Sequence, residues 1–220
     1  LNNKHIILLT QDRGVNENLI MQYTFENKVK PKSFTTIDEM DFKLGLHALK
    51  YHYINRQYRF PSEKKFDFIY WGSDKSKNAG GVKSGDDRLK IIKEINKDKE
   101  VSSTIIGRWP FPVEKKWIKM NEIVGYLDEA ITTVCFNWID QTAVTGRYPE
   151  SLACDVFPFV WKEYDTNNIL VADTFQRVFT KDELCDKIKE VKKSDKWLKK
   201  IKIDFLNKLP TEKEYYKEFD

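Results

Sequence analysis

Apolar, strand-like runs alternate with amphipathic, helix-like segments over most of the sequence, and this alternation restricts the possible folds more than any other feature. Strands that are separated by helices pair in parallel, and the sheet that they form is covered on both faces. The sequence therefore predicts an α/β fold built on a Rossmann-type parallel sheet. The strand-like runs span residues 66–72, 102–107, 131–139, 156–161 and 177–180, and the helix-like segments span residues 86–98, 120–130, 148–155 and 181–194.

The two ends of the chain carry other patterns. A strand is expected at residues 6–10, and apolar residues at helical spacing predict a basic, aromatic helix over 41–58. A polar stretch at 61–65 separates these elements from the alternating region. We therefore predict an amino-terminal portion (1–62), a Rossmann-like domain (63–194) and a helical segment (195–220) that packs back across the domains. The apolar seam of that segment consists of Trp197, Ile201, Phe205 and Leu209.

Composition sets broad limits on function. The chain has 220 residues, of which 40% are hydrophobic, and a net charge of +4, which permits contact with a polyanion without indicating one. No apolar run reaches the about 18 residues that a membrane span needs, and no signal peptide is recognisable. The odd number of cysteines, Cys135, Cys154 and Cys185, favours buried, reduced thiols in a cytoplasmic protein. Because the sequence begins at Leu1, close to a strand-like run, it is consistent with a fragment or a processed product.

A loop rich in glycine and lysine follows the first strand of the alternating region. In an open parallel sheet, ligands bind at the carboxyl ends of the strands, which is where this loop is expected. Gly72 and Ser73 are small enough for backbone N–H groups to approach an anion, and Lys83 and Arg88 lie at the entrance of the next helix. The pattern is no Walker loop, because the required Gly-Lys-Ser/Thr spacing is missing. A flexible, solvated loop is the alternative interpretation.

The stretch "TGRYPESLACD" holds a second candidate. Arg147 precedes Glu150 by three residues at a helix start, so both side chains are expected at one loop-helix junction. An arginine at such a place can bind a diphosphate bidentately, and a carboxylate can accept hydrogen bonds from both hydroxyls of a ribose. The alternative is a local ion pair with a carboxylate that the helix dipole favours.

These segments, taken in order with "IIG", "WIKMN" and "FTKDELCDKIKEVKKSD", resemble the carboxyl-terminal half of the T-even phage DNA β-glucosyltransferases over about residues 66–219. The resemblance implies a GT-B-like fold and inverting transfer of glucose from UDP-glucose to 5-hydroxymethylcytosine in double-stranded DNA, inside an infected cell. It also implies the donor-site roles. Gly72, Ser73 and Arg147 would bind the diphosphate, Lys83 and Arg88 would add positive charge, Ile118 would pack on uracil, and Glu150 would bind the ribose.

The sequence departs from this family in two places. The loop after Ser73 is longer, which makes Lys75 and Lys77 alternative cations. Family members also have a complete amino-terminal domain that supplies a catalytic aspartate, whereas this chain resembles only its end. Asp12 is the candidate general base, although the matching register places Gln11 at that position. A second chain or a further segment would then complete the amino-terminal domain.

DNA contacts are expected on the helix predicted over 41–58 and just after it. Its cations suit phosphates and its aromatic rings suit stacking, whereas the alternative is an ordinary helix with a solvated basic face. The candidate DNA-binding residues are Lys43, Lys50, Arg56 and Arg59. Trp109 and Trp117 are candidates for shaping an acceptor pocket, with a core role as the alternative. His5, His47 and His52 are interpreted as structural or surface residues.

The sequence predicts no metal site, because no Asp-x-Asp pair is present. Mg²⁺ or Mn²⁺ held on the diphosphate stays an open alternative. Two other functions also stay open: a glycosyltransferase for another sugar or for an already glucosylated base, and a non-catalytic fragment or subunit that binds a UDP-sugar or DNA.

Overall fold

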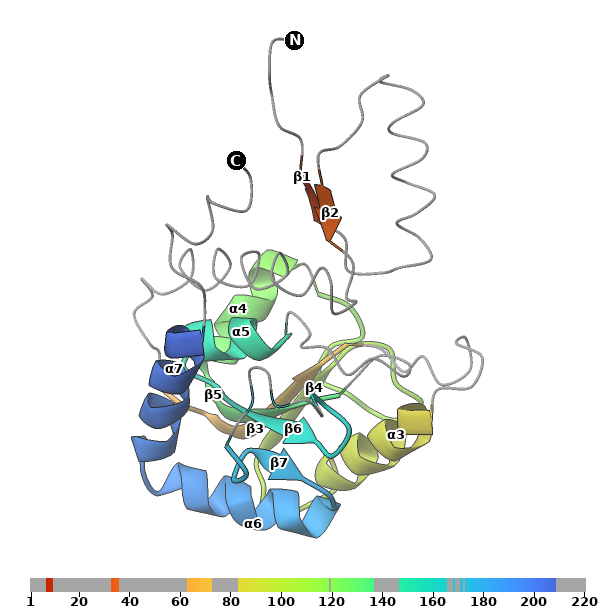
Figure 1. The fold of residues 1–220 in the computed structure, drawn as a ribbon. Helices are drawn as coiled ribbons and strands as arrows, with labels where there is room; N and C mark the ends of the chain where they lie inside the picture. The colour runs from red at the N-terminus through yellow and green to blue at the C-terminus, as the bar shows by residue number, and fades with distance from the viewer. Residues whose placement is uncertain are drawn as a thin grey trace, which may run out of the picture. The chain divides into compact units, whose positions relative to one another are not determined.

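The structure of this chain is a computed structural model that describes residues 7–9, 33–35, 63–72, 83–118, 120–136, 147–165, 168, 171 and 173–208 (Figure 1). The chain forms two compact units, Leu1–Tyr51 with Leu209–Asp220, and His52–Lys208. In the first unit, β1 (Ile7–Leu9) pairs in parallel with β2 (Ser33–Thr35). The strand predicted near the start is thereby confirmed. The helix predicted over 41–58 lies outside the described residues, and the predicted domain boundaries stay predictions.

The second unit contains the five-stranded sheet that the alternating pattern predicts. Every strand pairs in parallel with its neighbours, in the order β4-β3-β5-β6-β7. The short run predicted as an edge strand is at the edge of the sheet, where β6 is its one partner among the described strands. The strands are β3 (Phe66–Trp71), β4 (Ser103–Ile106), β5 (Ala130–Cys135), β6 (Phe157–Trp161) and β7 (Arg177–Val178).

Helices cover both faces of this sheet. In Figure 1, α4 and α5 lie on one face, and α3 and α6 lie on the other. The predicted helices are confirmed, although α3 begins at Lys83, three residues before the expected 86. The helices are α3 (Lys83–Ile95), α4 (Met120–Asp128), α5 (Arg147–Ala153), α6 (Lys181–Lys192) and α7 (Lys196–Lys208).

The core follows from this layering. Because both faces of the central strands are covered, their residues are buried without alternation, including Phe68, Ile69 and Val134 at 0% exposure. Each such side chain contributes about 1.5–3 kcal/mol through burial of apolar surface. Even Thr132 is buried, and its hydroxyl donates a hydrogen bond of 2.6 Å to the carbonyl oxygen of Asp67. The cysteines Cys135, Cys154 and Cys185 are buried and no disulfide joins any two of them, in agreement with the expected buried thiols.

The helix α7 packs on the second unit through its predicted apolar seam. Trp197 stacks on Phe175 with ring centroids 4.1 Å apart, and Phe205 contacts Tyr148 at 5.7 Å. Ile201 is 1% exposed, so three of the four seam positions are confirmed and Leu209 lies outside the described residues. Whether the segment crosses to another domain stays a prediction.

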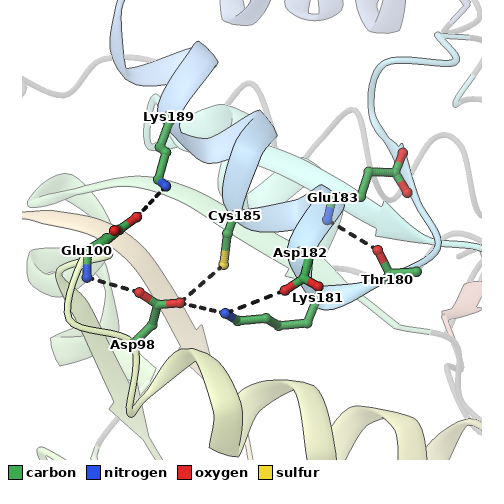
Figure 2. Close-up of polar contacts among 8 residues, drawn as sticks. All are labelled: Asp98, Glu100, Thr180, Lys181, Asp182, Glu183, Cys185 and Lys189. Carbon is green, nitrogen blue, oxygen red and sulfur yellow. Dashed lines mark hydrogen bonds and ion pairs between the residues drawn. The ribbon is translucent and has the colours of Figure 1, made fainter.

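A polar network joins the turn after α3 to α6 (Figure 2). The Asp98 carboxylate accepts hydrogen bonds from Lys181 Nζ at 2.6 Å, from the backbone N–H of Glu100 at 2.9 Å and from Cys185 Sγ at 3.8 Å. Thr180 caps α6 by accepting a hydrogen bond from the backbone N–H of Glu183. These contacts attach α6 to a connection that lies more than eighty positions earlier in the sequence.

No helix among the described residues has the length and apolar character that a membrane span requires.

Candidate functional site

A pair of glycines brings the carboxyl ends of two neighbouring strands into contact. Gly72 follows β3 and Gly107 follows β4, and both have positive φ angles, +135° and +130°. The Gly72 N–H donates a hydrogen bond of 3.0 Å to the carbonyl oxygen of Ile106. A Cβ on Gly107 would lie 1.7 Å from the Gly72 carbonyl oxygen, so no other residue fits there. We call Gly72 and Gly107 the glycine junction.

Arg147, the first residue of α5, reaches this junction. Its Nη2 donates a hydrogen bond of 2.5 Å to the carbonyl oxygen of Trp71, and its Nη1 donates one of 3.1 Å to the Tyr70 hydroxyl. The guanidinium also lies over both of these rings, 4.6 Å from the Tyr70 centroid and 5.0 Å from the Trp71 centroid. A Cβ on Gly72 would approach Nη2 to 3.0 Å. The structure thus places the predicted arginine and the predicted glycine side by side.

The surroundings of Arg147 keep it charged. Burial disfavours the guanidinium charge, but Tyr70, Cys135 and Glu150 act against burial and the net pKa of Arg147 is raised. Burial raises the pKa of the Cys135 thiol to about 12, although the nearby Arg147 charge acts in the opposite direction. At neutral pH the site therefore holds a fixed positive charge beside an un-ionised thiol.

Glu150 lies in the first turn of α5 and is partly exposed. Its carboxylate acts electrostatically on both Arg147 and Cys135. The expected arrangement, with the arginine and the glutamate at one helix start, is confirmed by the bounds of α5. What the two side chains bind stays a prediction.

The second predicted cation, Arg88, enters from α3. Its guanidinium lies 6.0 Å from the centroid of the Trp109 ring, and the edge of that ring meets Tyr70 at 5.6 Å. Lys83 is the first residue of α3, so it lies at the helix entrance as expected, and only its backbone is described. Ile118 packs against the apolar cluster that contains Trp71 and Ile106.

Aromatic side chains form a row along the carboxyl ends of four strands. Neighbouring ring centroids lie 5.6 Å apart for Trp109 and Tyr70, 5.9 Å for Tyr70 and Phe136, and 5.6 Å for Phe136 and Trp161. Sequence analysis missed Tyr70, Phe136, Trp161 and Gly107 as members of the site. What they share is the carboxyl end of an observed strand. Tyr70 and Trp161 are the next-to-last residue of β3 and the last of β6, and Gly107 and Phe136 directly follow β4 and β5. The strand expected to continue to residue 139 ends at Cys135, so Phe136 belongs to the connection that follows it.

The two tryptophans singled out in the sequence have different environments. Trp109 is 8% exposed and belongs to the aromatic row, whereas Trp117 is 66% exposed. The structure therefore separates one buried indole in the aromatic row from one indole on the surface.

Several predicted site residues lie outside the described part of the chain. These are the candidate base Asp12 with its alternative Gln11, the loop residues Ser73, Lys75 and Lys77, and the DNA-contact candidates Lys43, Lys50, Arg56 and Arg59. Their roles stay predictions. Within the described residues, no group of three or more His, Cys, Asp or Glu side chains is arranged to hold a metal ion.

The chemistry of the described site is that of hydrogen-bond donors and positive charge. Arg147 and Arg88 contribute guanidinium groups, and the glycine junction leaves backbone free of side chains at the end of β3. The amino end of α3 adds backbone N–H groups that have no partner within the helix. Such an arrangement suits a phosphorylated ligand better than a cation or an apolar molecule.

Comparison with known proteins gives matches among solved structures only. No protein-family model matches the sequence, and no curated protein matches it. Three similar structures are of T4 phage β-glucosyltransferase. One contains UDP-glucose, with a TM-score of 0.54 and 20% identity, and the match covers 87% of this chain and 56% of that one. One concerns substrate binding and a proposed mechanism, with a TM-score of 0.55 and 21% identity, and the match covers 87% of this chain and 58% of that one. One contains UDP and Mn²⁺, with a TM-score of 0.54 and 20% identity, and the match covers 87% of this chain and 55% of that one.

The chain therefore spans little more than half the length of the structures it matches. These matches confirm the predicted GT-B-like, Rossmann-type fold, and they confirm the resemblance at the level of the fold.

Proposed function

We propose that this chain carries the donor-binding part of a UDP-sugar-dependent glycosyltransferase that moves glucose to 5-hydroxymethylcytosine in double-stranded DNA. The observation on which the proposal rests is the buried Arg147 guanidinium, fixed on the carboxyl end of β3 beside the glycine junction. The fold supports the proposal as well, because it is shared with β-glucosyltransferase structures that contain UDP-glucose or UDP.

The diphosphate is placed at the end of β3. The side-chain-free backbone of Gly72 lets it approach, and because the Gly72 N–H already donates to Ile106, the donors around it are Ser73, the amino end of α3 and the guanidinium of Arg147. Arg88 and Lys83 add positive charge. Hydrogen bonds from charged donors to phosphate oxygens are about twice as strong as neutral ones. Because Trp71 and Tyr70 already orient Arg147, little conformational entropy is lost when the ligand binds.

The proposed nucleoside site lies between Glu150 in the first turn of α5 and Ile118, which precedes α4. The Glu150 carboxylate accepts hydrogen bonds from the ribose hydroxyls, and Ile118 packs on the uracil ring. Ile118 already contacts the core cluster, so its position is fixed by packing and does not depend on the ligand. This arrangement distinguishes UDP from purine nucleotides by the size of the base and by apolar contact.

Transfer is a direct displacement. The acceptor hydroxyl oxygen attacks the anomeric carbon of glucose on the face opposite UDP, the bond from that carbon to the diphosphate oxygen breaks, and the configuration inverts. Asp12 takes the hydroxyl proton, and the cations of the donor site stabilise the charge that develops on the departing UDP.

The other proposed contacts involve DNA and, as an alternative, a metal ion. Lys43, Lys50, Arg56 and Arg59 bind DNA phosphates. A divalent cation, as the alternative, would be held through the diphosphate, and no step is assigned to it.

The test is transfer of radiolabelled glucose from UDP-glucose to hydroxymethylated duplex DNA. Wild-type protein should label this DNA and should not label unmodified DNA. Arg147→Ala should weaken UDP binding on the order of a hundredfold, because it removes a hydrogen-bonding charge. Glu150→Gln should weaken binding of UDP more than that of 2′-deoxy-UDP.

A matched control uses a second helix-start carboxylate. Glu122→Gln alters an exposed glutamate in the first turn of α4 and should change UDP affinity little. If the wild type binds none of UDP, GDP and ADP, the proposal is wrong. Binding of UDP without transfer to any DNA would favour the alternative, a non-catalytic chain that binds a UDP-sugar.

A further inference from the structure

We propose that Trp109 is an additional donor-site residue, whose indole N–H donates a hydrogen bond to a phosphate oxygen of the bound nucleoside diphosphate. This inference rests on the proposed UDP-sugar function. It assigns a ligand contact to a side chain that sequence analysis treated only as a candidate for shaping an acceptor pocket.

The position of the indole nitrogen is the first argument. Trp109 follows the end of β4 by three residues, and its Nε1 lies 3.2 Å from the place that a Cβ on Gly107 would occupy. The carbonyl oxygen of Gly72 lies 1.7 Å from the same place. The indole N–H therefore lies beside the glycine junction, where the proposed diphosphate binds.

The second argument is that the N–H is buried and unsatisfied. Among the described residues, Trp109 Nε1 has no hydrogen-bond partner, and the side chain is 8% exposed. Arg147, whose guanidinium lies beside Gly72, likewise has its Nε buried without a partner in the described part of the chain. Most buried donors in proteins are paired, because leaving one unpaired is unfavourable. Two residues with an unpaired donor, one beside each glycine of the junction, indicate a ligand that brings acceptor oxygens.

The charges around the indole favour a phosphate over a sugar hydroxyl. Arg147 contacts the Gly72 side of the junction, and the Arg88 guanidinium lies over the Trp109 ring. An acceptor placed between two guanidinium groups is stabilised most when it is anionic. A phosphate oxygen meets this condition, whereas a neutral hydroxyl does not.

The indole is also held in a fixed orientation. The edge of Tyr70 meets it at 5.6 Å and an interplanar angle of 73°, and Phe111 packs on it at 5.5 Å. Because these rings fix the indole before the ligand arrives, its hydrogen bond needs little reorganisation.

The experiment measures UDP and uridine affinities by titration calorimetry on the full 220-residue chain. Trp109→Phe keeps an aromatic ring and removes the N–H. Its UDP affinity should fall about ten- to a hundredfold, as expected for a hydrogen bond to a charged group, while its uridine affinity stays unchanged. Unchanged UDP affinity, or an equal loss for uridine, would overturn the inference.

The matched control is Trp197→Phe. Trp197 lies in α7, and its indole N–H already donates to Glu190 at 3.2 Å. This variant makes the same exchange of an indole for a benzene ring. Because Trp197 is not part of the proposed site, the variant should keep the UDP affinity of the wild type.

A second measurement does not depend on the variant folding. In ¹H–¹⁵N spectra of the wild type, UDP should move the Trp109 indole proton downfield, whereas uridine should leave it in place. If the resonance assigned to the Trp109 indole N–H does not shift when UDP is added, the inference is overturned.

The outcomes also separate this inference from the function on which it rests. If the wild type binds no UDP, both fail. If the wild type binds UDP and Arg147→Ala weakens binding while Trp109→Phe does not, only the role of Trp109 fails.

Discussion

Individual backbone angles decide how the candidate site is built. Gly72 and Gly107 adopt positive φ angles at the ends of adjacent strands, and their missing side chains leave room for a carbonyl oxygen and a guanidinium. With a side chain at Gly107 the two strands could not approach as they do. The site therefore depends on two residues that contribute no functional group of their own.

Gly72→Ala should lower stability and loosen the site. The φ of +135° is unfavourable for alanine by about 1–3 kcal/mol, and the new Cβ would lie 3.0 Å from Arg147 Nη2. The flexible guanidinium moves more easily than the backbone, so it should shift from the Trp71 carbonyl, and UDP affinity should fall. Urea unfolding and UDP titration measure the two effects.

The control for this prediction is Gly125→Ala in α4. A Cβ at Gly125 meets nothing within 4 Å, and the residue is exposed. Alanine within a helix is favoured over glycine, so this variant should be more stable by about 0.5–1 kcal/mol. If Gly72→Ala were as stable as Gly125→Ala, the argument from backbone conformation would be wrong.

At the scale of elements, α6 is attached by charge as well as by apolar packing. Leu184 and Ile188 face the core, at 0% and 1% exposure. Lys181 and Lys189 pair with Asp98 and Glu100 on the turn after α3, at 2.6 Å and 2.5 Å. Fully exposed ion pairs add little to the stability of a protein. Asp98, however, also accepts a hydrogen bond from a backbone N–H, and its side chain is only 16% exposed.

Asp98→Asn should destabilise the second unit at neutral pH by about 1–2 kcal/mol. Hydrogen bonds to charged groups are worth about 1.5–3 kcal/mol, and solvent screens part of this at a partly exposed site. Hydrogen bonds from Lys181 and the backbone of Glu100 lower the pKa of Asp98 in the folded protein. Its stabilisation is therefore complete above the unfolded-state pKa of about 4 and is lost as the pH falls through the lower folded-state pKa. The difference between wild type and variant should shrink in urea unfolding at about pH 2–3.

Asp186→Asn serves as the comparison, because Asp186 is an exposed carboxylate on the same helix. Its unfolding curve should follow that of the wild type at each pH. A pH profile of Asp98→Asn that runs parallel to the wild type would contradict the role given to the network.

At the scale of the whole molecule, the proposed donor site and the candidate base belong to different units. Arg147, Gly72 and Trp109 lie in His52–Lys208, whereas Asp12 lies in Leu1–Tyr51 with Leu209–Asp220. Donor binding and catalysis should therefore respond separately to substitution.

Asp12→Asn should reduce glucose transfer about 10²–10⁴-fold, the usual contribution of a general base, and should leave UDP affinity unchanged. Transfer rates on hydroxymethylated DNA and UDP titration test the two parts. Gln11→Ala examines the alternative register, and it should transfer glucose normally if Asp12 is the base. Full activity of Asp12→Asn would show that the base is another residue.

The sequence by itself determined the type and order of the elements in the second unit. Their periodicities are local, so the parallel sheet, the edge strand at 177–178 and the apolar seam of α7 are all readable from neighbouring residues. The helix-start pair of Arg147 and Glu150 was readable for the same reason, because a single turn of helix contains both.

Only the tertiary structure decided which strands are neighbours and which side chains meet. The alternation of strands and helices predicts parallel pairing, but it does not fix the order β4-β3-β5-β6-β7. The contact between Arg147 and Trp71 joins residues 76 positions apart, and no local pattern encodes it. Gly107 and Trp109 join the site because β4 lies beside β3. Local sequence specifies elements, whereas a binding site at a sheet edge arises from the packing that brings distant strand ends together.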